Sequence, residues 1–160
     1  MLICFNLHLS PKTPLMTYLI RKAAEKDRIA VYHFICGLEE TNFDPVNFEI
    51  IYTKNMANKD NCYLVAESAA NSIIGFISCH MQSLLHHCGK VAEIQELYTD
   101  KNYRGIGIGK ALLNAMEKRL IENNCILFEV TAQNKRDSTH RFYETNGFLF
   151  THKKFVKQLS

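Results

Sequence analysis

The sequence predicts a single α/β (α+β) domain, and three observations favour this fold class. A strand-like run at 91–98 passes into a helical pattern through a glycine-rich turn at 103–110. Two apolar runs at 62–67 and 73–82, with a polar turn between them, are typical of a β-hairpin. The chain has 160 residues, of which 47% are hydrophobic and 22% charged, and this suits one globular domain with a sizeable core.

The beginning of the chain follows no regular pattern. Residues 1–15 mix apolar residues with Pro11 and Pro14, and they carry neither the basic start nor the small-residue cleavage signal of a secretory peptide. We therefore predict a dispensable N-terminal extension at 1–15 and a folded domain at 16–160. Deleting residues 1–15 should leave activity intact, and loss of folding would refute this prediction.

Regular elements follow from residue 17 onward. Residues 17–22 alternate as a strand does, and the apolar spacing over 25–38 predicts a helix. Pro45 suits the first turn of a second helix. The remaining elements are, in order, the hairpin at 62–67 and 73–82, the central strand at 91–98, a helix ending near Asn124, a strand at 126–131, a short helix at 138–145, and closing strands at 148–152 and 155–159.

Three of these elements, the helix ending near Asn124, the strand at 126–131 and the short helix at 138–145, are each predicted by a local pattern. Apolar residues three and four apart, from Leu112 to Leu120, predict the third helix. β-branched and aromatic residues predict the strand at 126–131. Gly147 tolerates the left-handed backbone that ends many helices, so we expect it to end the short helix.

The glycine-rich turn is the most informative stretch for function. Gly105, Gly107 and Gly109 lie where a strand passes into a helix, so that backbone N–H groups lack helical partners and the helix dipole adds partial positive charge. Because glycine has no side chain, a large anion can approach this backbone closely. The turn therefore predicts a pyrophosphate site, although a tight turn that binds nothing has the same spacing.

Two motifs resemble those of the GCN5-related N-acetyltransferases (GNAT). Arg104-x-x-Gly107-x-Gly109 matches the acyl-CoA loop of that superfamily, Gln/Arg-x-x-Gly-x-Gly/Ala. The run Phe142-Tyr143-Glu144-Thr145-Asn146-Gly147-Phe148 resembles its last helix and the turn after it, and the whole resemblance extends from Met16 to Leu159. It implies a mixed, mostly antiparallel sheet of about six to seven strands, with about four flanking helices and central strands splayed near Glu96.

The resemblance also implies acetyl-CoA as co-substrate. Backbone groups of the glycine turn would hold its pyrophosphate, and the central strand beyond a bulge would pair with its pantetheine arm. The cofactor-binding residues predicted in this way are Leu97, Tyr98, Thr99, Arg104, Gly105, Ile106, Gly107, Ile108, Gly109 and Lys110.

Transfer of an acetyl group to an amine needs a base and an acid. An alkyl amine with a pKa near 10.4 is neutral in about one molecule in a few thousand at pH 7, and a carboxylate can take its proton. Glu96 is the first candidate and Glu93 the second, and they would face opposite sides of the strand unless a bulge lies between them. Tyr143 matches the tyrosine that gives a proton to the coenzyme A sulfur in many relatives. Solvated strand carboxylates and a core aromatic residue are the plainer interpretations.

The histidines before the central strand carry a narrower resemblance. His80 with Gln82, and the pair His86-His87, resemble the aminoalkylphosphonate N-acetyltransferases in type and spacing. We predict that these four residues bind the acceptor, a small primary amine such as an aminoalkylphosphonate. They could instead bind a divalent metal, which we do not expect, and each histidine alone is more often an ordinary surface residue. A polyamine, an aminoglycoside and a protein lysine stay open as acceptors.

Charge and composition narrow the partners. A net charge of +3 provides no concentrated basic face for nucleic acid, and no run of roughly eighteen apolar residues predicts a membrane span. Six scattered cysteines without a Cys-x-x-Cys pair favour reduced thiols in a cytoplasmic protein. We expect a monomer or a homodimer. The alternative to an enzyme is a non-catalytic acyl-CoA-binding sensor, which would tolerate loss of Tyr143 and Glu96.

Overall fold

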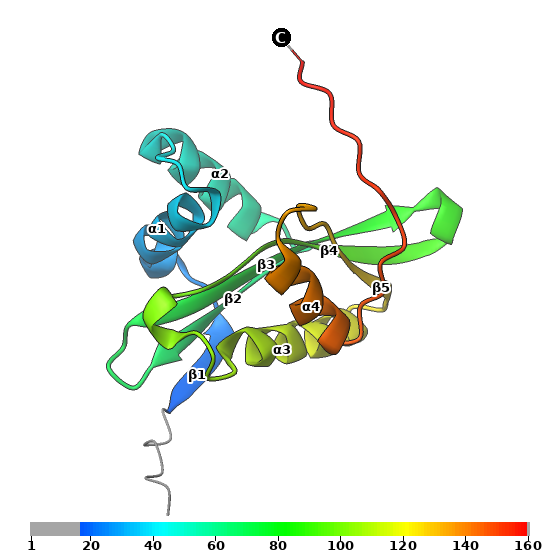
Figure 1. Cartoon of the computed structure of the whole chain (residues 1–160). Helices are drawn as coiled ribbons and strands as arrows, with labels where there is room; N and C mark the ends of the chain where they lie inside the picture. Colours follow the sequence, from blue (N-terminus) through cyan, green and yellow to red (C-terminus); the bar gives the residue numbers. More distant parts are fainter. Residues whose placement is uncertain (1–16, 160) are drawn as a thin grey trace, which may run out of the picture.

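In the computed structural model, which describes residues 17–159, five strands form one mixed sheet with helices on both faces (Figure 1). In order across the sheet they are β1 (Tyr18–Lys22), β2 (Asn61–Ser68), β3 (Ile73–Leu84), β4 (Gly89–Thr99) and β5 (Cys125–Val130). Neighbouring strands from β1 to β4 are antiparallel, whereas β5 is parallel to β4. The predicted mixed, mostly antiparallel sheet is confirmed.

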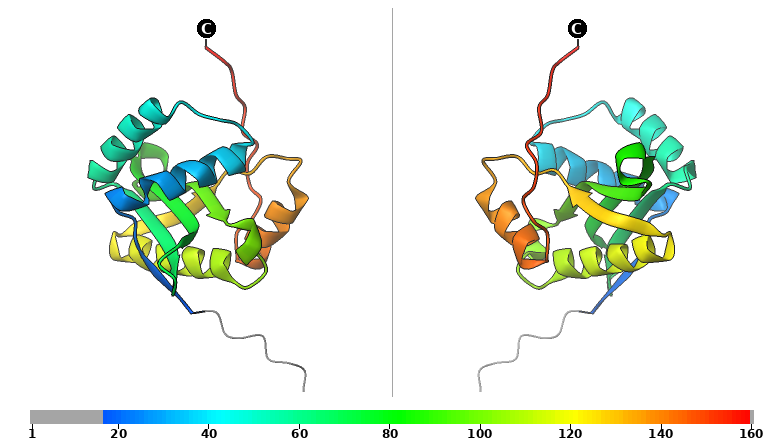
Figure 2. Two further views of the ribbon diagram at one scale, coloured as in Figure 1. Left: turned by 90° about the vertical axis from the view of Figure 1, so that its left-hand side faces the viewer. Right: turned by 90° about the vertical axis from the view of Figure 1, so that its right-hand side faces the viewer.

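Four α-helices within the same residues cover the sheet, as predicted. On one face lie α1 (Arg28–Glu39) and α2 (Pro45–Ala57); on the other lies α3 (Ile108–Glu122), with α4 (Asp137–Thr145) beside it (Figure 2). Asp44 begins α2, because its side chain accepts hydrogen bonds from the backbone N–H groups of Val46 and Asn47. Gly147, at φ 89°, follows α4. None of the helices described is long and apolar enough to cross a membrane.

Alternation of side chains along the strands builds a separate core on each face of the sheet. Leu64 and Ala66 of β2 belong to the core under α3, whereas Val65 belongs to the core under α1 and α2. The inward stripe of α3 contributes Leu112 and Met116, which are fully buried. The sheet is therefore held from both sides, and its central strands are fixed in position.

β4 carries one extra residue, Gln95, relative to β3. Ser78 of β3 pairs with Glu96, and the next residue of β3 pairs with Ile94, so that Gln95 is bulged out of the ladder. The bulge resets the alternation and places Glu93 and Glu96 on the same face, toward α1 and α2. Both carboxylates can therefore serve one site, which the sequence permits only if such a bulge lies between them.

β4 and β5 separate beyond Ile94. Their ladder ends where Ile94 pairs with Val130, and within the described chain the edge of β4 from Gln95 to Thr99 has no neighbouring strand on that side. The splay predicted near Glu96 is confirmed. An unpaired strand edge offers its N–H and C=O groups to an extended ligand.

The closing strands predicted at 148–152 and 155–159 are wrong. No strand is formed there, and the segment runs away from the body of the domain (Figure 1). Phe148 is half-buried against Tyr143, but the large apolar side chains after it are exposed, from 73% for Phe150 to 91% for Phe155. Apolar alternation predicts a strand, but a strand persists only where a neighbour takes its hydrogen bonds and a surface covers its apolar face. The sheet therefore has five strands, fewer than predicted.

The Arg21 side chain links β1 to α1 and β2 through hydrogen bonds. Its guanidinium donates hydrogen bonds to Asp27 at 2.6 and 2.8 Å and to Glu67 of β2 at 2.6 Å. Asp27 directly precedes α1 and is 3% exposed. These contacts join β1, α1 and β2 near the start of the domain. The predicted extension at 1–15 lies outside the described residues and stays a prediction.

Candidate active site

The glycine turn has an open backbone. Gly105 (φ 80°) and Gly107 (φ 90°) adopt the left-handed conformation, and a Cβ atom at either would meet no atom within 4 Å. Gly107 is the N-cap residue of α3 and has no side chain that could cap the helix, and the N–H of Ala111 donates the first helical hydrogen bond, to the Gly107 carbonyl at 3.0 Å. The N–H groups before Ala111 therefore face the space in front of the helix, where an anion can bind.

Arg104 joins this turn to the end of β4. Its Nε donates to the Thr99 carbonyl at 3.2 Å, and its guanidinium lies over the Tyr98 ring, 5.6 Å from the centroid. Tyr98 in turn stacks on Phe34 of α1, with centroids 5.0 Å apart. These contacts hold a positive charge beside the open backbone of the turn.

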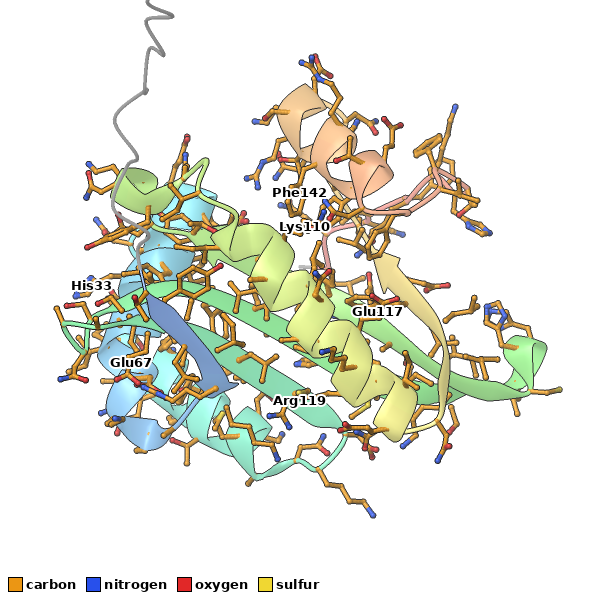
Figure 3. All side chains as sticks on the ribbon, turned by 90° about the horizontal axis from the view of Figure 1, so that it is seen from below. His33, Glu67, Lys110, Glu117, Arg119 and Phe142 are labelled. Carbon is orange, nitrogen blue, oxygen red and sulfur yellow. The ribbon has the colours of Figure 1, made fainter. Side chains whose placement is uncertain are left out.

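α4 reaches the same place from the other side. A Cβ atom on Gly109 would lie 3.4 Å from the Phe142 ring and 3.6 Å from Thr99 Oγ1, so α3, α4 and the end of β4 converge here. Figure 3 shows Phe142 of α4 close to Lys110 in the first turn of α3. The structure thus brings together the two motifs and the end of the central strand.

Tyr143, the predicted proton donor, is buried on the inner side of α4. Its ring packs against Phe142 and Phe148, with centroids 5.4 and 5.3 Å away. Burial raises the pKa of Tyr143 to about 12. The phenol therefore keeps its proton at neutral pH, as a donor must.

Glu96, the first candidate base, is held at the bulge by Ser78. The Ser78 hydroxyl donates to Glu96 Oε2 and accepts a hydrogen bond from the Glu96 backbone N–H at 3.1 Å. Burial raises the pKa of the Glu96 carboxyl, the Ser78 hydrogen bond lowers it in part, and the charge of Glu39 raises it further. A carboxylate with a raised pKa is a better proton acceptor than an exposed one.

Glu93, the second candidate, belongs to a polar group next to Glu96. It accepts a hydrogen bond from Thr131 Oγ1 at 2.9 Å and pairs across the ladder with His80. The His80 ring stacks parallel to Tyr63, with Nε2 3.4 Å from its hydroxyl, and that hydroxyl accepts a hydrogen bond from Asn55 at 2.9 Å. Burial lowers the pKa of His80 although Glu93 opposes this, so the imidazole is neutral at neutral pH.

A cavity of about 370 Å³ lies between α1, α2 and the sheet, with Glu96 in its wall. Its volume is within the ~300–1,000 Å³ typical of small-molecule sites. Aromatic side chains dominate its lining: Phe43, Phe48, Tyr52, Tyr63 and Phe76. The candidate base therefore faces a space in which a small molecule can lie.

The other predicted acceptor residues lie elsewhere. His86 and His87 form a short 3₁₀ turn at the end of the β3–β4 hairpin, and Gln82 is exposed on β3. His80 contacts the cavity residue Tyr63, but these three do not line the cavity, and their roles stay predictions. Across residues 17–159, no group of three or more His, Cys, Asp or Glu side chains is arranged to hold a metal ion.

Sequence reasoning misses two residues that support this site, Ser78 and Tyr63. Neither stands in a motif, and their contacts depend on how β2, β3 and β4 are aligned. The signal in the sequence is weak: Ser78 is a small polar residue between Ile77 and Cys79 in an otherwise apolar strand. A buried hydroxyl in such a strand needs a partner, which here is Glu96.

Comparison with known proteins decides the family. Residues 29–148 match the model of the Acetyltransferase (GNAT) family. The chain belongs to this family. It is an acetyltransferase, and acetyltransferases of the GNAT fold use acetyl-CoA.

Individual relatives agree with this assignment. The GNAT chain is 34% identical over 140 residues to an aminoalkylphosphonate N-acetyltransferase of Salmonella typhimurium, covering 88% of this chain and 90% of the relative. The resemblance to these enzymes, inferred from the sequence, is confirmed.

Solved structures share the fold. A transcriptional regulator from Bacillus halodurans C-125 is 25% identical, with a TM-score of 0.82 over 89% of this chain and 100% of its own. Glucosamine-6-phosphate N-acetyltransferase from Arabidopsis thaliana, at 19% identity and a TM-score of 0.75, covers 90% and 99% and shows the fold alone.

Proposed function

We propose that this acetyltransferase moves the acetyl group of acetyl-CoA onto the primary amine of a small molecule by direct attack on the thioester. The observation that carries the proposal is the free edge of β4, from Gln95 to Thr99. This edge has Glu96 and its cavity near one end and the glycine turn near the other. The coenzyme needs an anion site and a backbone edge, and the amine needs a carboxylate beside a cavity.

The open turn supports binding of the donor. The N–H groups of 105–110 and the Arg104 guanidinium would hold the pyrophosphate, because both lie beside space that a glycine Cβ leaves empty. The backbone of Leu97, Tyr98 and Thr99 would pair with the pantetheine arm as an added strand. When bound, acetyl-CoA supplies the activated acetyl group.

Two side chains would manage the protons. Glu96 takes the amine proton, directly or through a water. Deprotonating an amine with a pKa near 10.4 costs about 4–5 kcal/mol at pH 7. Glu93, on the same face, is the second candidate for this role. Tyr143 gives its proton to the sulfur as the thiolate leaves, and with a pKa of about 12 its hydroxyl is protonated at neutral pH.

The acceptor is a primary amine that fits beside Glu96. The similarity to the Salmonella typhimurium enzyme supports an aminoalkylphosphonate as one such amine. A polyamine, an aminoglycoside and a protein lysine are the alternatives.

The test is the release of free thiol from acetyl-CoA when the protein is mixed with a panel of these amines. Thiol that appears only with both protein and amine supports the proposal. A protein that binds coenzyme A by calorimetry but releases no thiol with any amine would be the acyl-CoA-binding sensor, and the proposal would be wrong.

A further inference from the structure

The charges around the acceptor cavity are of one sign. Glu96 and Asp44 both line it, and within residues 17–159 no Lys, Arg or His side chain does. The rest of the lining is aliphatic, aromatic or amide. The described lining thus offers an ammonium ion the Glu96 carboxylate, with the Asp44 carboxylate engaged at the start of α2, and it offers an anion no cation.

Three basic side chains near these helices are already engaged. Arg28 of α1 is paired with Glu25 and Glu49. Arg136 donates a hydrogen bond to the carbonyl of Leu38 at 3.1 Å and lies 3.9 Å from a Glu39 oxygen. His80, next to Tyr63, is neutral at neutral pH. None of these three is free to compensate an anionic group inside the cavity.

The consequence for an acceptor follows from desolvation. A phosphonate placed in this cavity would lose its hydration next to two carboxylates without gaining a counter-charge. An apolar group would lose little and would bury its surface against Phe48, Ile51 and Phe76. The walls therefore discriminate between acceptors that carry the same amine on different tails.

We propose, on the basis of the function proposed above, that the preferred acceptor is an aralkylamine. Its primary amine lies at Glu96 and its aromatic or branched apolar tail lies between α1 and α2. Aminoalkylphosphonates are then the poorer substrates of this chain. The contact that carries the proposal is the juxtaposition of Glu96 with a mostly apolar wall in which residues 17–159 place no basic side chain.

Two amines with the same two-carbon linker test this preference. Thiol release from acetyl-CoA is measured with 2-phenylethylamine and with 2-aminoethylphosphonate over a range of concentrations. We expect kcat/KM to be at least about tenfold higher for 2-phenylethylamine, a usual scale for discrimination by an apolar pocket. Equal or higher kcat/KM for the phosphonate would overturn the proposal.

A neighbouring pair of isoleucines supplies a matched control. Ile50 and Ile51 of α2 are exposed to the same extent, 59% and 58%, but Ile51 lines the cavity and Ile50 does not. Ile51→Lys should lower the ratio of kcat/KM for 2-phenylethylamine to kcat/KM for 2-aminoethylphosphonate about tenfold or more. Ile50→Lys should leave this ratio within about twofold of the wild-type value. A third variant, Ile51→Glu, separates charge from size, because it should not improve phosphonate turnover. An unchanged ratio in Ile51→Lys, with the Tm of both lysine variants near the wild-type value, would contradict the proposal.

Direct binding separates this inference from the proposed reaction. If no amine of the panel, 2-phenylethylamine included, releases thiol, the proposed function fails, and calorimetry with 2-phenylethylamine on the coenzyme A-bound protein then decides the inference alone. Heat that persists in Ile50→Lys and disappears in Ile51→Lys supports the apolar acceptor site. No heat with the wild-type protein overturns it.

Discussion

At the scale of single residues, the Glu96 carboxyl is placed where its charge is disfavoured. Its pKa in the folded protein lies above the ordinary value, chiefly because of burial. At a pH between the unfolded and the folded pKa, the folded state therefore binds a proton that the unfolded chain has already released. The stability that comes with this proton is fully present below the unfolded pKa and is lost as the pH rises through the folded pKa. Above the folded pKa the ionised carboxylate therefore weakens the fold.

Glu96→Gln should therefore lower activity and raise stability. We expect kcat to fall by about 10²–10⁴ because the proton acceptor is gone, and the Tm at a pH above the Glu96 pKa to rise because a buried charge is gone. In the wild type, kcat/KM should rise with pH through the Glu96 pKa, and this limb should be absent in the variant. Steady-state kinetics over pH and calorimetric unfolding measure both. Glu93→Gln serves as the comparison, and a wild-type rate in Glu96→Gln across pH would remove Glu96 from the mechanism.

Tyr143 tests the other proton transfer. Tyr143→Phe keeps the ring between Phe142 and Phe148 and removes the hydroxyl, so kcat should fall by about 10²-fold while the Tm and the coenzyme A Kd change little. Tyr18→Phe, in a half-buried tyrosine of the same core, should leave kcat unchanged. Unchanged turnover in Tyr143→Phe would assign the tyrosine to packing alone.

At the scale of elements, the start of α3 depends on backbone geometry more than on side chains. Gly107 has a positive φ in front of an uncapped helix end, and open space lies where its Cβ would be. An alanine there is strained by the left-handed backbone and also projects a methyl group into the proposed diphosphate position. These two effects can be separated with a second glycine.

Gly107→Ala and Gly147→Ala form that pair. Both positions have φ near 90°, and a methyl group at either would meet no atom within 4 Å, so each variant should lose about 1–2 kcal/mol of unfolding free energy from backbone strain alone. The coenzyme A Kd should rise about tenfold or more in Gly107→Ala alone, because Gly147 follows α4 and lies outside the turn. Calorimetric titration and denaturant unfolding make the comparison, and equal Kd values in the two variants would contradict a diphosphate site at 105–110.

At the scale of the whole molecule, one buried ion group ties the first strand to the domain. Asp27 is almost fully buried and accepts hydrogen bonds from Arg21 and from the Ala24 backbone N–H. Burial alone would raise the pKa of Asp27, but these hydrogen bonds outweigh burial and lower it. The resulting stability is present above the unfolded pKa and is lost as the pH falls through the folded pKa.

Asp27→Asn should cost about 3 kcal/mol of unfolding free energy at pH 7, since it leaves Arg21 without part of its partner in a buried group. The difference from the wild type should shrink as the pH falls below the ordinary aspartate pKa. Lys26→Met, which removes an exposed partner 3.9 Å from Glu67, should change stability by less than about 0.5 kcal/mol. Denaturant unfolding at pH 7 and pH 3 measures these differences, and a loss in Asp27→Asn that does not depend on pH would show that packing, not charge, is responsible.

Features that depend on neighbouring residues could be predicted from the sequence. The glycine turn, the capped start of α2 and the apolar stripe of α3 were predictable, because each depends on residues within a few positions of one another. The two GNAT motifs, at Arg104 and at Tyr143, could be placed for the same reason. The backbone conformation that each motif requires is determined by residues close to it in the sequence.

Contacts between distant segments decided the rest. Only the register of β3 against β4 bulges Gln95 and gives Glu96 its partner Ser78, since strand pairing depends on which segments meet in the folded sheet. The tail at 148–159 has the alternation of a strand but pairs with no strand of the described chain, although the outer edge of β5 is open, so local alternation by itself does not form a strand. The sign of charge in the acceptor cavity arises in the same way, because residues from α1, α2 and the sheet meet there. Local sequence determined most of the elements and the glycine turn, whereas tertiary packing decided the environment of Glu96 and the lining of the cavity beside it, since these join residues far apart in the chain.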